Sequence, residues 1–320
     1  MTTVVTGGTG VVGQALLKHL VDGQSAIRVV VRDSARSVPE GVEPAIGDVL
    51  AYPTLERAFQ GADVVFHVAG VNKMCVPDAT QMYRVNVDGT RNVLKAAVAA
   101  GVRRVVYTSS AVTIGEASGT VGTEDSVHRE HFYSHYERSK YEAEHVVLHE
   151  AGDLDVVIVN PSSVQGPGRA SGTGKILLDL IAGRLSTVID TRISIVDIDD
   201  CARGHILAGL QGLAGRRYIL NSFSMTIQEA VGMLASVTDR PLRVKYLPAP
   251  VGVVGATLIG AVYRLVGKQA PVCREMVRTL VHGHVYDGSR AARELGLSYT
   301  PATDTLSRLI SWARAESLIP

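Results

Sequence analysis

Short runs of β-branched and other apolar residues alternate with longer mixed segments along the first 160 residues of the chain. The runs lack the strict alternation of a half-exposed strand, which indicates strands buried on both faces. Strands are predicted at residues 3–6, 27–31, 42–46, 63–68, 104–108 and 154–160, with helices between them at 11–21, 54–60, 80–100 and 132–150. This order is typical of an α/β fold with a doubly wound parallel sheet.

The pattern changes after residue 161, where glycines crowd between 166 and 174. Helices are then predicted at 175–182, 202–210, 226–237 and 303–317, and strands at 193–198 and 217–221. No linker rich in proline, glycine and serine separates the two halves. We therefore expect residues 1–165, with further core elements near 193–221, to form the sheet domain, and residues 166–320 to form mainly a smaller α+β lobe packed on it.

The composition is that of an ordinary folded chain of 320 residues, with 46% hydrophobic residues and a formal net charge of +1. This balance gives no reason to expect nucleic acid or an anionic membrane as a partner. An apolar run at 251–262 falls short of the roughly 20 residues that a spanning helix needs. We expect no membrane span, and a buried or pocket-lining helix at 251–262.

The three cysteines, Cys75, Cys201 and Cys273, are far apart and form no CxxC pair. They predict isolated thiols in a reducing cytoplasm, and neither a disulfide framework nor a zinc ribbon. The N-terminus enters a predicted strand at once, without the regions of a signal peptide. These observations predict a cytoplasmic protein.

A glycine-rich turn follows the first predicted strand, in the sequence Thr6-Gly7-Gly8-Thr9-Gly10-Val11-Val12-Gly13. Glycines at these spacings allow a tight turn, a close approach of the backbone to a pyrophosphate, and close packing of helix on strand. The N-terminus of the following helix offers free N–H groups to the phosphates. Between the first strand and the first helix of an alternating fold, this motif predicts a dinucleotide site.

The end of the second predicted strand indicates which dinucleotide is bound. An acidic residue there binds the ribose 2′-hydroxyl of NAD, whereas an arginine accommodates the 2′-phosphate of NADP. Arg32 occupies this place, with Asp33 beside it and Arg36 close behind. A guanidinium offers a bidentate fork to phosphate, so NADP is favoured and NAD stays possible through Asp33.

A second constellation joins Ser110, at the end of the fifth predicted strand, to Tyr136 and Lys140. Residues at i and i+4 share one face of a helix, so the ammonium can lower the pKa of the phenol. Such a tyrosine exchanges a proton with a carbonyl or carbinol oxygen, which the serine hydroxyl orients. None of the other ten tyrosines is followed by a lysine four residues on.

With these motifs the chain resembles an extended short-chain dehydrogenase/reductase of the epimerase/dehydratase superfamily. Within that family it is similar to the dihydroflavonol-reductase-like and 3β-hydroxysteroid-dehydrogenase-like branch. Besides the glycine turn and the Ser–Tyr–Lys set, the resemblance rests on Val31-Arg-Asp-Ser34, Asp48-Val49, His67-Val-Ala-Gly70, Asn86, Asn160-Pro-Ser-Ser-Val-Gln-Gly-Pro167 and Asp197-Ile-Asp-Asp-Cys-Ala-Arg-Gly-His205.

The resemblance implies a Rossmann fold and a role for each matching residue. Tyr136 is the implied acid/base, Lys140 holds the nicotinamide ribose and tunes Tyr136, and Ser110 polarises the substrate oxygen. The implied cofactor-binding residues are Thr6, Gly7, Gly10, Val11, Val12, Gly13, Arg32, Arg36, Asp48, Val49, Val68, Ala69, Gly70, Asn86, Tyr136, Lys140, Pro161 and Ser163. The implied activity is hydride transfer between NAD(P) and a carbonyl or carbinol carbon of a small molecule. The family also suggests a homodimer.

Two departures separate the chain from the sugar-nucleotide epimerases and dehydratases of the family. Ile114-Gly115 stands where those enzymes usually carry Tyr-Gly, and Ile193 stands where an arginine meets the nucleotide, with Arg192 one residue away. Both changes suggest an apolar pocket floor and a hydrophobic substrate. A sugar-nucleotide epimerase or dehydratase with retained NAD, and an NADP(H)-binding regulatory protein, remain as alternatives.

Several histidines have helical spacing, which can indicate zinc. They are His128, His131, His135, His145 and His149. Since no HExxH arrangement occurs and the first three adjoin Tyr136, we expect no metal site there and interpret them as solvated or substrate-facing. His67 and His205 are expected to pack against strand ends.

Overall fold

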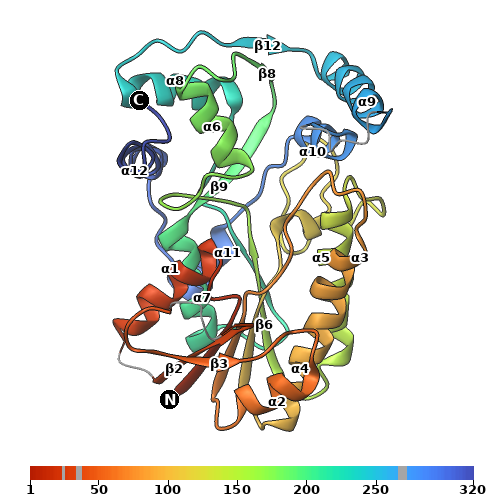
Figure 1. Ribbon diagram of the computed structural model, residues 1–320, viewed down its shortest axis with the longest axis vertical. Coiled ribbons are helices and arrows are strands. Elements are labelled where there is room, and N and C mark those ends of the chain that lie inside the picture. The colour runs from red at the N-terminus through yellow and green to blue at the C-terminus, as the bar shows by residue number, and fades with distance from the viewer. Residues whose placement is uncertain (24–25, 34–37, 266–271) are drawn as a thin grey trace.

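The computed structural model describes residues 1–23, 26–33, 38–265 and 272–320, and it has a seven-stranded parallel sheet at its centre (Figure 1). The strand order is β10-β6-β5-β4-β1-β2-β3. The strands are β1 (Thr2–Thr6), β2 (Ala26–Val31), β3 (Val42–Ile46), β4 (Val64–His67), β5 (Arg104–Thr108), β6 (Asp155–Pro161) and β10 (Arg217–Leu220). The predicted doubly wound Rossmann fold is confirmed.

Helices cover both faces of this sheet. One face carries α1 (Val11–Val21), α7 (Ile198–Gln211) and α11 (Ser289–Leu295), and the other carries α2 (Tyr52–Phe59), α4 (Gly89–Ala99) and α5 (His135–Glu150). Successive residues of a strand point to opposite faces, so Val5 packs in the first layer and Val4 in the second. Both are fully buried, which explains the continuous apolar runs of the sequence.

The segment predicted as one helix at 80–100 is divided in three. It consists of α3 (Thr80–Tyr83), a π-helical turn at Arg84–Asp88, and α4. Insertions of this kind within helices often accompany functional sites, and Asn86 lies in the turn.

The upper lobe of Figure 1 is built on two small sheets with helices around them. Their strands are β7 (Ser163–Gln165), β9 (Arg192–Asp197) and β11 (Phe223–Thr226) in one sheet, and β8 (Thr187–Ile189) and β12 (Lys245–Leu247) in the other. The helices are α6 (Thr173–Ile181), α8 (Ile227–Thr238), α10 (Arg274–His282) and α12 (Ala302–Ala315). Of the strands predicted near 193–221, one lies in this lobe, as β9, and the other joins the main sheet, as β10 beside β6.

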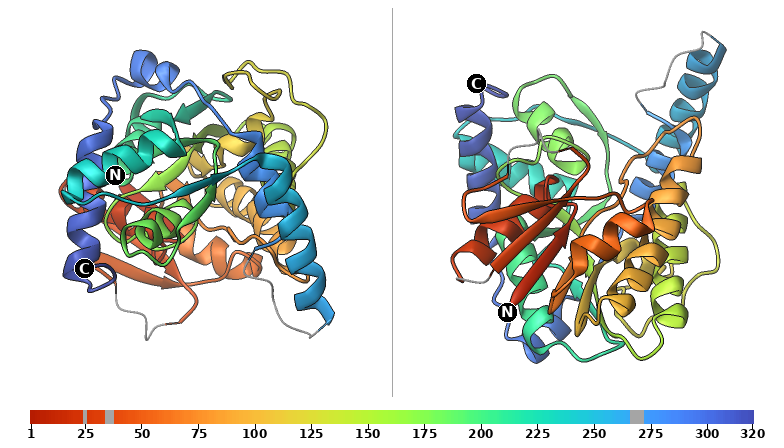
Figure 2. Two further views of the ribbon diagram at one scale, coloured as in Figure 1. Left: turned by 90° about the horizontal axis from the view of Figure 1, so that it is seen from above. Right: turned by 60° about the horizontal axis from the view of Figure 1, so that its bottom comes forward.

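The prediction of a buried or pocket-lining helix at 251–262 is wrong. That run lies in α9 (Ala249–Leu265), which stands out from the body in the right-hand view of Figure 2. Val254 and Leu258 are 59% and 63% exposed, because few described elements pack against this helix. No helix within the described ranges is both long and apolar enough to cross a membrane.

The prediction of three isolated thiols is also wrong. Cys75 and Cys273 form a disulfide with their Cα atoms 5.5 Å apart, while Cys201 is a buried free thiol. The bond joins the loop after β4 to the N-cap of α10. A separation of 198 residues hid this pairing, because only the folded chain brings the two segments together.

Candidate active site

The turn between β1 and α1 has the form of a phosphate cradle. Gly7 has φ +74°, and a Cβ on it would lie 2.5 Å from the backbone nitrogen of Ala69. A Cβ on Gly13 would lie 2.3 Å from the carbonyl oxygen of Gly7. Gly10 caps α1 without a side-chain hydrogen bond, so the first N–H groups of the helix are available to a ligand.

A cavity of about 830 Å³ runs from this turn to the Ser–Tyr–Lys set. Most of the residues predicted for the site line it: Thr6, Gly7, Gly10, Val11, Val12, Gly13, Arg32, Asp48, Val49, Val68, Ala69, Gly70, Ser110, Tyr136, Lys140, Pro161 and Ser163. Two predicted cofactor residues are not among them. Arg36 lies outside the described residues.

Asn86 is the second predicted cofactor residue that does not line the cavity, because it is buried behind the cavity wall. Its Oδ1 accepts the backbone N–H of Val71 at 2.7 Å, and its Nδ2 donates to the Ser139 hydroxyl at 2.9 Å. It therefore ties the segment after β4 to α5. Of Asn86 and its two partners, only Val71 lines the cavity.

Tyr136 and Lys140 are placed by the first turns of α5. Ser134 caps this helix by accepting the N–H of Glu137 at 3.1 Å. Burial raises the pKa of Tyr136, while a hydrogen bond with Ser110 and the charge of Arg169 act in the opposite direction. The arrangement brings a phenol and a hydroxyl to one point of the cavity wall.

Lys140 lies four residues after Tyr136 on α5, and its side chain reaches the end of β5. Its ammonium donates to the carbonyl of Thr108 at 2.6 Å and lies 4.6 Å from the centre of the Tyr107 ring. Burial lowers the pKa of Lys140 to about 7, and the charge of Glu144 opposes this shift.

Glu144 is a residue that the sequence analysis missed. Its Oε2 accepts hydrogen bonds from the Ser109 hydroxyl at 2.5 Å, the Thr113 hydroxyl at 2.8 Å and the Asn160 amide at 3.0 Å. The carboxylate thus fixes the segment that presents Ser110. Its spacing of four residues from Lys140 on one helix was the available signal.

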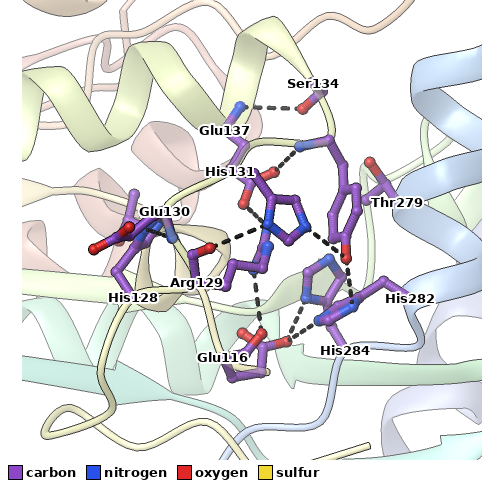
Figure 3. A network of polar contacts seen from close by, with 12 residues as sticks. Glu116, His128, Arg129, Glu130, His131, Ser134, Glu137, Thr279, His282 and His284 are labelled. Carbon is purple, nitrogen blue, oxygen red and sulfur yellow. Dashed lines mark hydrogen bonds and ion pairs between the residues drawn. The ribbon is translucent and has the colours of Figure 1, made fainter. Parts of the chain in front are cut away.

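A second buried carboxylate, Glu116, lies below α5 and faces two histidines (Figure 3). His282 Nε2 and His284 Nδ1 bond its Oε1 at 3.1 and 2.6 Å. Burial alone would raise the pKa of Glu116, but these hydrogen bonds hold it at about 2. The three donor atoms lie close enough to hold a metal ion, and this set differs from the histidines weighed in the sequence analysis. Among those earlier histidines, His131 joins the network through Tyr133, and none lines the cavity.

The far part of the cavity wall is partly apolar. Ile193 lies there, as the departures from the sugar-nucleotide pattern suggested, and so do Met276 and Leu280 of α10. Ile114 does not reach the cavity and packs instead against Ile219 and Tyr286. Arg192 lines the cavity as well, so this wall also carries positive charge.

The sheet, the glycine turn and the Ser–Tyr–Lys set define a dinucleotide-dependent oxidoreductase, and comparison with known proteins agrees. Residues 4–211 match the 3-beta hydroxysteroid dehydrogenase/isomerase family. A Synechocystis relative, provisionally named a dihydroflavonol 4-reductase, is 33% identical over 96% of this chain and 93% of its own. Sterol demethylase protein B of Methylococcus capsulatus is 31% identical over the full length of both chains. The crystal structure of gox2253 superposes with a TM-score of 0.86 at 31% identity, over 100% of this chain and 99% of the other.

The chain therefore belongs to the 3-beta hydroxysteroid dehydrogenase/isomerase family, a branch of the extended short-chain dehydrogenases/reductases. It is an NAD(P)-dependent oxidoreductase that acts on alcohol or carbonyl groups. The family resemblance stated from the sequence is confirmed.

Proposed function

We propose that this protein transfers hydride reversibly between NADP(H) and a carbonyl or carbinol carbon of a small hydrophobic molecule. The observation that carries the proposal is the meeting of Tyr136, Ser110 and Lys140 on one wall of the cavity that begins at the glycine turn. The bound nicotinamide supplies or accepts the hydride.

The protein's own residues handle the proton and the orientation of the substrate. The Ser110 hydroxyl and the Tyr136 phenol both bond the substrate oxygen, and Tyr136 gives it a proton as the carbonyl is reduced. We assign to Lys140, four residues from Tyr136 on the same face of α5, the positive charge that stabilises the tyrosinate as it forms. In the direction of oxidation the same proton returns to Tyr136.

We assign each part of the dinucleotide to residues that line the cavity. We assign the pyrophosphate to Gly7, Gly10 and Gly13, where an added Cβ on Gly7 or Gly13 would collide with backbone. Arg32 lines the cavity at the end of β2 and Asp33 does not, which supports NADP over NAD. Asp48 and Val49 are assigned to the adenine, and Pro161 and Ser163 to the nicotinamide carboxamide.

The substrate is assigned to the upper lobe, and residues 1–165 with β10 to the cofactor. Ile193, Met276 and Leu280 favour a hydrophobic molecule. The names of the relatives, a sterol demethylase protein and a dihydroflavonol reductase, point to polycyclic alcohols and ketones. We also propose a homodimer through α4 and α5, where Val98 and Leu148 are 59% and 46% exposed.

Replacing Tyr136 with phenylalanine tests the proposal. We expect turnover of 3β-hydroxysteroids and hydrophobic 3-hydroxy acids with NADP⁺ to fall at least about 100-fold, because general acid–base groups contribute 10²–10⁴-fold. NADPH affinity, followed by nicotinamide fluorescence, should change little. Tyr141→Phe, five residues along the same helix and not among the residues that line the cavity, is the control. Turnover by Tyr136→Phe within a few-fold of the wild type would rule the assignment out.

A further inference from the structure

Arg169 places a guanidinium on the wall of the cavity. It lies in the loop between β7 and α6, and its Nε is buried without a hydrogen-bond partner. Within the described part of the chain, no carboxylate forms a salt bridge with it. By contrast, Arg104, Arg129 and Arg290 are also largely buried, and each pairs with a carboxylate.

The loop is shaped to hold this side chain. A Cβ on Gly174, the second residue of α6, would lie 2.5 Å from the carbonyl oxygen of Arg169 and 3.3 Å from its Cγ. Only glycine leaves that room, so the start of α6 packs directly on the backbone and stem of Arg169. The fold therefore holds the backbone and the Cγ atom of Arg169 in place.

The charge of Arg169 acts at the reacting end of the cavity. It partly opposes the rise that burial causes in the pKa of Tyr136, and the two groups line the same cavity. Burial in turn lowers the pKa of Arg169, which reflects the cost of holding a guanidinium away from water without a partner. An anion bound at this point removes that cost.

We propose that Arg169 binds the carboxylate of the substrate, so that the substrate is a hydrophobic hydroxy acid or the corresponding oxo acid. A guanidinium matches a carboxylate bidentately, and such charged pairs are strong where water is excluded. The apolar remainder of the molecule then faces Ile193, Met276 and Leu280. The inference rests on the proposed function and specifies its substrate class. Arg169 takes no part in the transfer: hydride still passes between the carbinol carbon and the nicotinamide, and the proton between the oxygen and Tyr136.

The alternative ligand for Arg169 is a phosphate group of the dinucleotide. The substrate is favoured because Arg169 lines the same cavity as Tyr136 and its charge acts on that phenol, whereas the N–H groups at the start of α1 and the Arg32 guanidinium are available to the phosphates. If Arg169 binds the substrate, replacing it lowers kcat/KM for the acid; if it binds the phosphate, replacing it lowers the affinity for NADPH.

The test compares a charged and an uncharged form of one probe. The probe is 3-hydroxydodecanoate, with its methyl ester as the neutral form, and kcat/KM is measured with NADP⁺ for the wild type, Arg169→Gln and Arg169→Lys. We expect Arg169→Gln to lower kcat/KM for the acid about 10- to 100-fold, the usual worth of a hydrogen bond to a charged group, and to leave the ester within about 3-fold. Arg169→Lys should keep part of the preference for the acid. Equal losses for acid and ester would overturn the proposal.

Two further measurements separate the alternatives. NADPH affinity should be the same in Arg169→Gln and the wild type, and a loss there would assign Arg169 to the cofactor phosphates instead. Arg192→Gln removes an exposed arginine from the same cavity and should keep the preference for the acid. Loss of the preference in this variant would show a general effect of positive charge, and the specific role of Arg169 would be wrong.

Binding without turnover distinguishes failure of this inference from failure of the proposed function. Calorimetric titration of the Tyr136→Phe–NADPH complex with 3-hydroxydodecanoate should show binding that the additional Arg169→Gln change removes. Absence of binding by the acid overturns the carboxylate site even if other alcohols are oxidised. Retained turnover in Tyr136→Phe, by contrast, overturns the proposed function alone.

Discussion

Single residues in this site owe their chemistry to burial and to their neighbours. Lys140 is 5% exposed, and burial lowers the pKa of its ammonium to about 7. Glu144, four residues along α5, partly restores the charged form and also orders the strand end that carries Ser110. Tyr136 and Lys140 were found from the sequence by their motif. Glu144, Glu116 and Arg169 were not, because a single glutamate or arginine becomes notable only when the fold buries it.

Arg32 provides a prediction about cofactor choice. Replacing Arg32 with alanine removes the only guanidinium that the described end of β2 offers to the ribose phosphate. We expect NADPH affinity to fall about 10-fold or more and NADH affinity to change little, because only NADPH carries the 2′-phosphate. Nicotinamide fluorescence titrations measure both. Equal losses for the two cofactors would assign the preference to Asp33.

His67 provides a prediction about pH. It is buried at the end of β4, bonded to the hydroxyls of Thr6 and Thr90, and burial together with the charge of Lys140 lowers its pKa to about 3. Between about pH 6.5 and pH 3 the His67 imidazole binds a proton in the unfolded chain and stays neutral in the folded chain. The free energy of unfolding therefore falls as the pH falls, by up to about 1.4 kcal/mol per pH unit.

Urea unfolding at pH 7 and pH 4.5 measures this effect. The His67→Gln variant should be less stable than the wild type at pH 7, yet lose less stability between the two values. His149→Gln, which changes an exposed histidine, is the control and should follow the wild type. A wild-type stability that does not fall over this range would contradict the prediction.

At the scale of elements, the strands and helices of the sheet were predicted well from the sequence. The strand at 42–46 and the helix at 11–21 have the observed bounds. The helix at 80–100 was predicted as continuous, because the π-helical turn at Arg84–Asp88 carries no proline or glycine to mark it. The helix at 251–262 was expected to be buried because of its apolar residues, yet its outer face meets no described element.

The disulfide between Cys75 and Cys273 joins two segments that both line the cavity, next to Met74 and Met276. In denaturant without reductant we expect one reactive thiol per chain, that of Cys201, and three after reduction. Reduction should also lower the free energy of unfolding by about 2–4 kcal/mol. Thiol titration and urea unfolding measure these values, with Cys75→Ser as the matched variant. Three reactive thiols before reduction would contradict the bond.

At the scale of the whole molecule, the sheet is completed by chain from the second half. β10 pairs with β6, and α7 covers the sheet with α1, through fully buried residues such as Cys201 and Ala208. A fragment of residues 1–165 would leave the edge of β6 unpaired and this face uncovered.

We therefore expect the fragment 1–165 to lack a cooperative unfolding transition, while the full chain unfolds cooperatively. Circular dichroism during urea titration measures the transition, and dye binding reports exposed apolar surface. A sharp transition in the fragment would show that the cofactor domain folds without β10 and α7.

The sequence by itself determined the fold, the cofactor cradle and the Ser110–Tyr136–Lys140 set. Local periodicity and short motifs predict those features, because they depend on residues that are close together in the sequence. Only the tertiary structure decided the partners of Cys75 and Glu116, the separation of Arg169 from every described carboxylate, and the exposure of α9. Each of these depends on which distant segments the folded chain brings together and which it leaves without a neighbour, and no local pattern records that.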